Sequence, residues 1–424
     1  MLAASARVLL LAALAAASCN SDLDCSLNGE CQSGKCVCDA AWLGEACDTL
    51  ALLPSAPGAG TCDASRNGTA TGYTTTWGGH PVLDADGVWH AHVAEMAQHC
   101  GMCSWGSQSQ VAHYSSTGGL AGPYARVGTA VGAFSHNPSV ISTPSAVAPG
   151  GDPDGANYLM FHIGIGCDSA GVHACNYSRL PACTNGSTPL HPRPAGGAPA
   201  PPPANVTRAV THTAAALAGP WRDTPADWRL PSCSNPSPLF LANGSLMLMC
   251  HGSYAQCGPD SGGLSFFTSL TADWKRGSYG FRCLGLLNGN LTHNGTLFRT
   301  ANEDPHLYAD ARGRLHILTH NQSPCYSGAA ASFYGADVRG CGGHFFSADG
   351  GESWRFAWRA AYNGTVRYTD GVVRTYKRER PKVVQDAAGS IIGLATGIGV
   401  ALVDAFAAGN DTACTLVARV ATGQ

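Results

Sequence analysis

The chain has 424 residues, of which 12% are charged, and its formal net charge is -3. Such a balance offers no basic surface to attract nucleic acid or an anionic membrane, so we expect neither as a partner. The 19 cysteines fit an oxidising compartment better than the cytosol. The composition therefore favours an exported protein.

The first 18 residues carry one arginine, an apolar run and small residues before Cys19. This pattern is typical of a secretory signal peptide, which is removed from the mature protein. Ten Asn-x-Ser/Thr sequons follow. Such sequences also arise by chance in Gly- and Thr-rich loops, and we expect about half of them to carry an N-linked glycan, on exposed turns. The apolar stretch 391–408 is interrupted by Asp404 and by glycines, so we expect no membrane span in the mature chain. We predict a secreted, extracellular glycoprotein.

A short cysteine-rich module follows at residues 19–48, with the spacing C-x5-C-x5-C-x4-C-x-C-x8-C. About thirty residues cannot bury enough apolar surface to fold alone, so disulfides must hold them, although six cysteines allow 15 pairings. The ending, with Trp42 and Gly44 before the last cysteine, resembles an EGF-like domain. That resemblance implies no calcium site, because the acidic residues before the first cysteine are missing, and it implies the pairs Cys19–Cys31, Cys25–Cys36 and Cys38–Cys47.

The small and proline-rich stretch 49–61 is typical of a linker, and it leaves residues 62–424 for a second domain. Five copies of one pattern recur there: a polar residue, a proline, a short apolar run, a glycine turn and a second apolar run. Such pairs of runs predict antiparallel hairpins. Repeats of this length and composition predict an all-β fold, a five-bladed β-propeller with almost no helix. The Cys-rich and Pro-rich insertion 167–205 is expected to be an exposed loop.

In a five-bladed propeller, the residues before the five prolines are expected to lie close together. The innermost strand of each blade starts at the mouth of a central funnel, so these residues are expected to face one pocket. They are His80, Asn137, Asn235, Asp304 with its neighbour Glu303, and Arg380 with its neighbour Glu379. Seven residues after the turn glycines Gly155, Gly244 and Gly313 stand three histidines that we expect at the same mouth: His162, His251 and His320.

Other interpretations of these residues stay open. An Asp or Asn before a proline can simply stabilise a local turn through its own hydrogen bonds. The histidines can be hydrogen-bonded interior residues or ligands of zinc or calcium. We predict neither a metal nor a cofactor. Three aromatic residues are expected near the funnel as platforms for sugar rings: Trp77, Tyr254 and Tyr326.

The strand starts "NP", "EDP" and "RPK" and the "GPW" strand resemble the five-bladed propellers of the glycoside hydrolase family 43 superclan, over about residues 70–420. The resemblance implies two carboxylates, one donating a proton to the leaving oxygen and one activating water. Glu303 matches the position of the acid and Asp304 that of the base, so we predict both as candidate catalytic residues. Because successive strand residues face opposite ways, one of the two would act with a partner across the funnel, His80 or Glu379. The first three blades depart from this pattern, because they carry His80, Asn137 and Asn235 where the family has acidic residues.

The predicted function is therefore that of a carbohydrate-active or carbohydrate-binding protein with altered catalytic carboxylates. Its remaining funnel residues would bind substrate, and its partner would be an extracellular glycan or a cell-surface glycoprotein. The alternative is an extracellular adhesion or scaffold protein that binds protein partners through the propeller and the EGF-like module.

Overall fold

The structure is a computed structural model. It describes residues 19–62, 74–97, 102, 105, 109–132, 134–144, 154, 156–164, 209–231, 233–251, 264–271, 273–284, 288–293, 296–321, 341–399 and 413–422. The predicted signal peptide, the insertion 167–205, Tyr254 and Tyr326 lie outside these residues.

The EGF-like module contains one 3-10 turn and two small sheets. The 3-10 turn η1 (Asp22–Cys25) precedes the hairpin β1 (Gly29–Gln32) and β2 (Lys35–Cys38), and β3 (Trp42–Leu43) pairs with β4 (Thr49–Leu50). The three disulfides that the resemblance implied are confirmed: Cys19–Cys31, Cys25–Cys36 and Cys38–Cys47.

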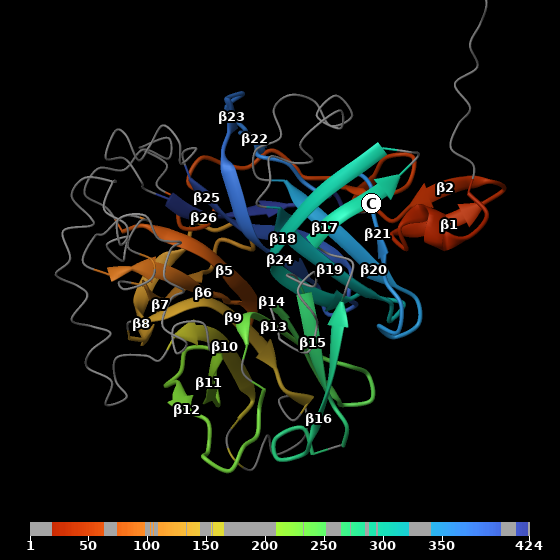
Figure 1. Cartoon of the computed structure of the whole chain (residues 1–424). Coiled ribbons are helices and arrows are strands. Elements are labelled where there is room, and N and C mark those ends of the chain that lie inside the picture. The colour runs from red at the N-terminus through yellow and green to blue at the C-terminus, as the bar shows by residue number, and fades with distance from the viewer. Residues whose placement is uncertain are drawn as a thin grey trace, which may run out of the picture.

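Five antiparallel sheets make up the propeller, which confirms the predicted fold (Figure 1). Blade 1 contains β5 (Thr76–Leu83), β6 (Trp89–Met96), β7 (Ser109–Ser116) and β8 (Ala125–Val131). Blade 2 contains β9 (Ser135–Ser142), β10 (Tyr158–Gly164), β11 (Ala209–Ala214) and β12 (Arg222–Asp223). Blade 3 contains β13 (Ser234–Phe240), β14 (Leu246–His251), β15 (Leu264–Ser269) and β16 (Tyr279–Leu284).

Blades 4 and 5 follow the same plan with local additions. Blade 4 contains β17 (Asn288–His293), β18 (Thr296–Ala309), β19 (Leu315–Asn321), β20 (Gly342–Ser347) and β21 (Arg355–Phe356). A separate hairpin, β22 (Thr365–Arg367) and β23 (Val373–Thr375), precedes blade 5, which contains β24 (Lys377–Gln385), β25 (Ile391–Gly399) and β26 (Ala413–Arg419). The apolar stretch at 391 therefore begins as a blade strand. Within the described residues, no helix has the length and apolar character needed to cross a membrane.

The predicted hairpins form because their turns share one chemistry. In the β5–β6 turn, the carboxylate of Asp84 accepts hydrogen bonds from the backbone N–H groups of Asp86 and Val88. Asp310 and Asp386 make equivalent bonds in the β18–β19 and β24–β25 turns. The turn glycines adopt left-handed φ angles that glycine tolerates best. Local turn chemistry thus fixes the register of the inner strand pair in these blades.

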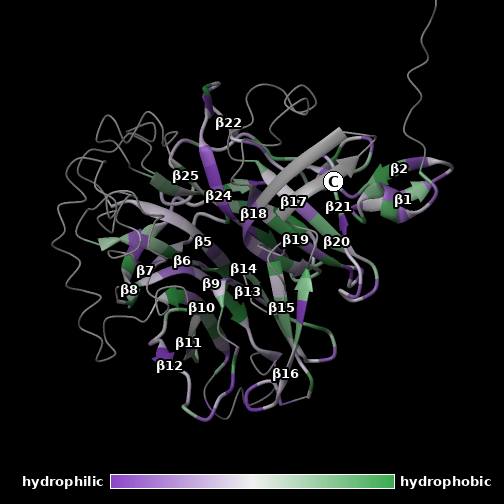
Figure 2. Cartoon of the chain, in the orientation of Figure 1, coloured by the Kyte–Doolittle hydropathy of each residue, from purple (hydrophilic) through white to green (hydrophobic). Residues whose placement is uncertain are grey.

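The blades close into a ring and pack through apolar side chains. The innermost strands contact one another in the order β5, β9, β13, β18, β24 and back to β5. Buried side chains of blades 1 and 5 share one cluster, and those of blades 3 and 4 share another. Figure 2 shows hydrophobic residues on strands such as β13 and β15 and hydrophilic residues at the β22 edge.

The segment predicted as a linker is fixed along the last blade. The backbone N–H of Leu53 donates to the carbonyl of Arg419, that of Thr61 donates to the carbonyl of Thr415, and Cys62 is disulfide-bonded to Cys414. Small and proline-rich residues suit this extended path as well as they suit a free linker, so composition alone did not distinguish the two.

The EGF-like module packs directly on blades 4 and 5. Buried module residues such as Trp42 share a core with Tyr308 of β18 and Leu394 of β25. The Trp42 ring also stacks on His344 at 5.1 Å, and Arg312 donates to Asp39 at the edge. The EGF-like module therefore packs against the propeller and is not an independent domain on a free linker.

Candidate functional site

Four of the five innermost strands bend sharply beside a proline. Register shifts interrupt β9, β13, β18 and β24 there. The residue before each proline has a left-handed φ: 53° at Asn137, 45° at Asn235, 50° at Asp304 and 56° at Arg380. Asn and Asp tolerate this conformation, whereas it strains an arginine. Such bulges redirect a side chain, and here they bring the four side chains together.

Blade 1 differs from the prediction, because Gly78 holds the equivalent position with φ 72°. The prolines of blades 3 to 5 precede their turn glycines by eight residues, whereas Pro81 precedes Gly87 by only six. A Cβ at Gly78 would lie 2.7 Å from the Cβ of Arg380, so only glycine allows this approach. His80 consequently lies outside the cluster described below, with its ring 5.4 Å from the His306 ring.

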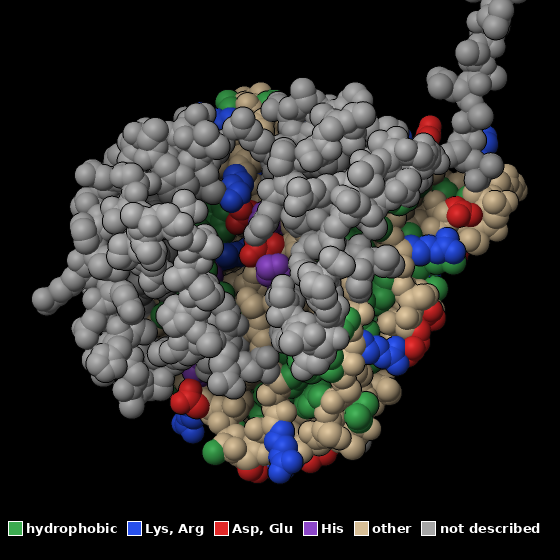
Figure 3. Space-filling view, in the orientation of Figure 1, with side chains coloured by type: hydrophobic (Ala, Val, Ile, Leu, Met, Phe, Trp, Pro, Cys, Tyr) green, Lys and Arg blue, Asp and Glu red, His purple; other side chains and the backbone are tan. Residues whose placement is uncertain are grey.

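We use the name funnel cluster for the polar side chains that meet at the inner strands: Asn137, Asn235, His251, Glu303, Asp304, His320, Glu379 and Arg380. They are eight of the ten residues named from the sequence, and the other two are His80 and His162. In Figure 3, acidic, basic and histidine side chains gather in the hollow in the middle of the face shown.

Asp304 is the hub of the funnel cluster. One carboxylate oxygen accepts from the Asn137 amide at 3.1 Å, and the other lies 3.3 Å from His320 Nδ1 and 3.5 Å from Arg380 Nε. Its side chain is only 2% exposed. Burial alone would raise the pKa of this carboxyl, but Arg380 and His320 outweigh burial and hold it well below its usual value. Asp304 is therefore an ionised anchor whose oxygens are already occupied.

Glu303 has the opposite character. Its Oε1 lies 3.4 Å from the Asn235 amide, which donates to it, and 3.8 Å from His251 Nδ1. Its side chain is 23% exposed. Burial and then the negative charge of Asp304 raise the pKa of Glu303 to about 7. Glu303 is thus a partly exposed carboxyl that holds a proton close to neutral pH.

Glu379 completes the group of carboxylates from blade 5. Its oxygens lie 3.3 Å from His320 Nε2 and 3.2 Å from the indole N–H of Trp77, and it pairs with Lys377. Burial opposes its ionisation, but His320 and Lys377 lower its pKa. His320 sits between two carboxylates, and they raise its pKa although burial lowers it. The funnel cluster therefore contains one proton-holding carboxyl beside two ionised ones.

His162 lies outside the funnel cluster. It is opposite the bulge of β9, stacks on His212 at 5.0 Å and bonds its Nδ1 to its own neighbouring carbonyl, that of Ile163. The residues of β14 and β19 that pair with the strand start are His251 and His320, whereas in β10 that residue is Ile163. Counting seven residues from Gly155 therefore ends one residue too early, at His162. Because successive side chains of a strand point to opposite faces, this shift of one residue places His162 on the other face of β10.

Sequence reasoning missed a second polar layer beneath the funnel cluster. His136 accepts from Arg380 through Nε2 and bonds Ser109 through Nδ1 at 2.6 Å. Lys382 is 1% exposed and donates to Ser139 at 2.8 Å, and burial lowers its pKa to about 8. Its place two residues after Arg380 was the available signal. His136 thus bonds to Arg380, and the charge of Lys382 interacts with that of Asp304.

The three ligand atoms of Glu303, Asp304 and His320 lie within 4.8 Å of one another. A cation there would have to displace the Asn137 amide and the His320 ring, which hydrogen-bond to Asp304, and it would lie close to the positive charge of Arg380, 3.5 Å from the same carboxylate. The geometry fits a hydrogen-bonded network better than a preformed metal centre. Trp77 is 4% exposed, so its ring is mostly covered and its role here is to donate to Glu379.

The comparisons with known proteins cover the two domains separately. Residues 21–49 match the Teneurin-like EGF domain. No curated protein matches the chain. An endo-arabinase from Bacteroides thetaiotaomicron is similar in structure, with 12% identity, 82% of this chain and 95% of that chain covered, and a TM-score of 0.44.

Two further solved structures are similar at the same level. One is a thermostable family-43 glycoside hydrolase, at 10% identity over 84% of this chain and 92% of that chain, with a TM-score of 0.45. The other is a family 43 β-xylosidase/α-arabinofuranosidase from a compost microbial metagenome, at 10% identity over 84% and 98%, with a TM-score of 0.45. What these enzymes act on is a property of those proteins, and the function proposed below rests on the side chains of this chain.

Proposed function

We propose that this chain is a secreted protein that binds an extracellular glycan, free or on a cell-surface glycoprotein, through the funnel cluster. The observation that carries this proposal is the partly exposed, proton-holding Glu303 beside His251, next to buried polar groups that pair with one another through Asp304. Sugar hydroxyl groups both donate and accept hydrogen bonds, and a protonated carboxyl, an amide and an imidazole offer both roles. A rigid, preorganised floor lowers the cost of ordering such contacts.

Secretion is supported by the covalent structure of the chain. The EGF-like module has three disulfides, and Cys62–Cys414 and Cys233–Cys250 occur in the propeller. Structural disulfides persist in oxidising compartments. The signal-like residues 1–18 agree with export.

Hydrolysis of a glycosidic bond is a second candidate, favoured by one specific observation. The environments of Glu303 and Glu379 push their pKa values in opposite directions, which is the arrangement that separates an acid from an ionised partner. In this mechanism Glu303 donates a proton to the leaving oxygen, and the ionised Glu379 accepts a proton from the water that attacks the anomeric carbon. Asp304 acts as a positioning residue for His320 and Arg380, because its own oxygens are occupied.

The test is a screen of the purified full chain against plant and algal polysaccharides on a carbohydrate array. We expect binding that soluble sugar blocks, and Glu303→Gln should weaken it about 5- to 150-fold, the effect of losing a buried hydrogen bond. The matched control is Glu352→Gln, which changes an exposed glutamate paired with Arg282. Binding to proteins alone would overturn the proposal and favour the scaffold alternative.

The same samples separate binding from hydrolysis. If the chain is a hydrolase, reducing sugar accumulates with the wild-type protein, and Glu303→Gln lowers the rate about 100- to 10,000-fold, as expected for a lost general acid. If it is a binding protein, no reducing sugar accumulates although the glycan is retained.

A further inference from the structure

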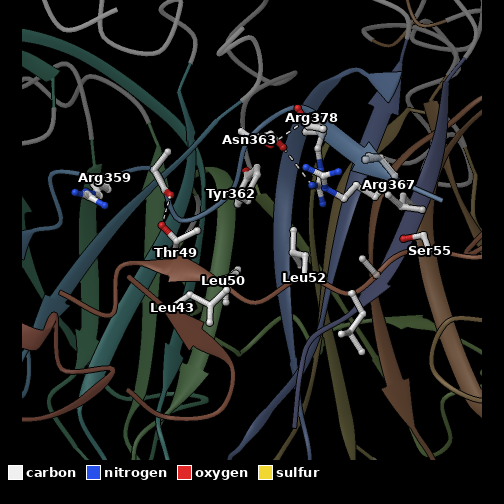
Figure 4. Close-up of a pocket in the computed structure, with 16 residues that line it drawn as sticks. Leu43, Thr49, Leu50, Leu52, Ser55, Arg359, Tyr362, Asn363, Arg367 and Arg378 are labelled. Carbon is white, nitrogen blue, oxygen red and sulfur yellow. Dashed lines mark hydrogen bonds between the residues drawn. The ribbon is translucent and has the colours of Figure 1, made fainter. Parts of the chain in front are cut away.

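A second site lies outside the funnel, between the EGF-like module and blade 5. A pocket of about 530 Å³ opens where the segment after the module runs past the β22–β23 hairpin and β24. We call it the β24 side pocket and define it by six of its lining residues: Leu50, Leu52, Tyr362, Asn363, Arg367 and Arg378. Figure 4 shows Leu50 and Leu52 on one side of it, with Tyr362 and Arg378 on the other.

The unusual feature of this pocket is the buried guanidinium of Arg378. The residue is 1% exposed, and its guanidinium lies 5.1 Å from the centre of the Tyr362 ring. Its Nε donates to Thr396 at 3.3 Å and its Nη1 to the carbonyl of Asn363 at 3.2 Å, but its Nη2 has no partner. Burial lowers the pKa of Arg378 to about 10, which leaves the side chain charged at neutral pH.

No carboxylate among the described residues compensates this charge. Each ion pair of Arg380, Lys377 and Lys275 joins the cation to an Asp or Glu within 4.0 Å, whereas Arg378 forms none. A buried charge without a counter-ion costs several kcal/mol in a fold, because the protein interior cannot replace its hydration. An uncompensated cation with a free N–H beside an open pocket therefore indicates that an anion completes it.

The rest of the pocket restricts the kind of anion. Arg359 and Arg367 also line the pocket and are exposed, so positive charge extends from the base of the pocket to its rim. Arg359 interacts electrostatically with Asp48 as well. Leucines form the opposite wall, and two of them are unusually exposed, Leu43 at 55% and Leu53 at 40%. Exposed leucines beside a cationic base suit a ligand that carries both an acidic group and an apolar part.

We propose that the β24 side pocket binds an oxyanion, a carboxylate, sulfate or phosphate group, on a molecule with an apolar portion. The acidic group accepts a charge-assisted hydrogen bond from the unpartnered Nη2 of Arg378. The apolar portion covers the leucine wall. This site and the proposed glycan site share no residue, so either can be correct without the other.

The experiment measures binding of three probes to the full chain by isothermal titration calorimetry at pH 7. Sodium octanoate carries both an acidic and an apolar part, sodium sulfate only the anion, and 1-octanol only the apolar part. We expect octanoate to bind at least 10-fold more tightly than 1-octanol. Sulfate as tight as octanoate would assign the site to a free oxyanion, whereas weaker sulfate binding supports the composite ligand.

The key variant is Arg378→Met, which keeps the length of the side chain and removes its charge. We expect octanoate binding to weaken at least 10-fold, while the control Arg276→Gln, at an exposed pair with Asp227, leaves it unchanged. Glycan binding by the funnel should also be unchanged in Arg378→Met. If octanoate does not bind the wild type, or binds both proteins equally, the proposal is wrong.

A second variant keeps the proposal testable if Arg378→Met does not fold. The double change Arg359→Gln and Arg367→Gln alters only exposed side chains. It should weaken octanoate binding about 3- to 10-fold by removing the charge at the rim. Unchanged binding in the double variant would also overturn the proposal.

Discussion

Arg378 and Arg380 lie two residues apart on β24, yet they have different electrostatic surroundings. Arg380 lies 3.5 Å from an Asp304 oxygen and also donates to His136. Arg378 faces a tyrosine ring, a hydroxyl and a carbonyl, with no carboxylate of the described residues beside it. This fold therefore supplies the counter-charge of a buried cation in the funnel and leaves that of Arg378 to be supplied from outside in the side pocket.

Removing the central counter-charge of the funnel should have the largest effect. Asp304→Asn leaves His320 and Arg380 buried without their shared carboxylate, so we expect a loss of about 3–5 kcal/mol in the free energy of unfolding. Urea denaturation at pH 7 measures it, with Glu352→Gln as a surface control that should change little. A loss below about 1 kcal/mol would show that the funnel cations do not depend on Asp304.

Replacing each arginine by methionine tests the comparison directly. Arg380→Met leaves the ionised Asp304 buried without this cation and should lower the free energy of unfolding by about 3–5 kcal/mol. Arg378→Met loses two hydrogen bonds but also removes an uncompensated charge, so we expect a cost of only about 1–2 kcal/mol. Both are measured by the same denaturation. Equal losses for the two variants would contradict the difference drawn between the two regions.

The raised pKa of Glu303 gives the funnel a pH dependence. The folded state binds this proton more tightly than the unfolded state does, since the pKa rises from its ordinary 4.5 to about 7. The associated stability is present below about pH 4.5 and is lost as the pH rises through 7. Between pH 5 and 7.5 the wild type should therefore lose on the order of 2 kcal/mol relative to Glu303→Gln. Parallel curves for the two proteins would refute the shift.

The ion pair at the edge of the module should give the smallest effect. Arg312 and Asp39 join the EGF-like module to the β18–β19 turn, but both are 39% exposed. Asp39→Asn should therefore cost only about 0.2–1 kcal/mol of docking. Hydrogen exchange of residues 19–47 measures it, and octanoate binding should be retained because Trp42 still packs in the shared core. Complete exchange of the module would mean that this pair, and not the core, holds it.

The propeller was predictable because its turns have local chemistry. An aspartate whose carboxylate accepts two backbone N–H groups, followed by a glycine, specifies a tight turn without help from distant residues, as at Asp310 and Gly313. The alternation of the inner strands then follows. Asn137, Asn235, Asp304 and Arg380 were placed together for the same reason, since each directly precedes a proline at a strand start.

Other features depended on information that spacing does not carry. His80 and His162 were misplaced because turn length differs between blades, and an offset of one or two residues changes the face or depth of a side chain. The docking of 49–61 on blade 5 depends on long-range pairing. The partners of the Asp304 oxygens were also not predictable from the sequence, because these contacts form only when three blades come together.

The most direct test of the central claim is to titrate the glutamates themselves. The chain has only six glutamates, so carboxyl-¹³C labelling of glutamate gives a small set of NMR signals to follow with pH. We predict that one signal titrates near pH 7, that Glu303→Gln removes it, and that the Glu379 signal titrates below its ordinary value. If every glutamate titrates below about pH 5, as unperturbed carboxyls do, the funnel holds no proton near neutral pH and the account of the site is wrong.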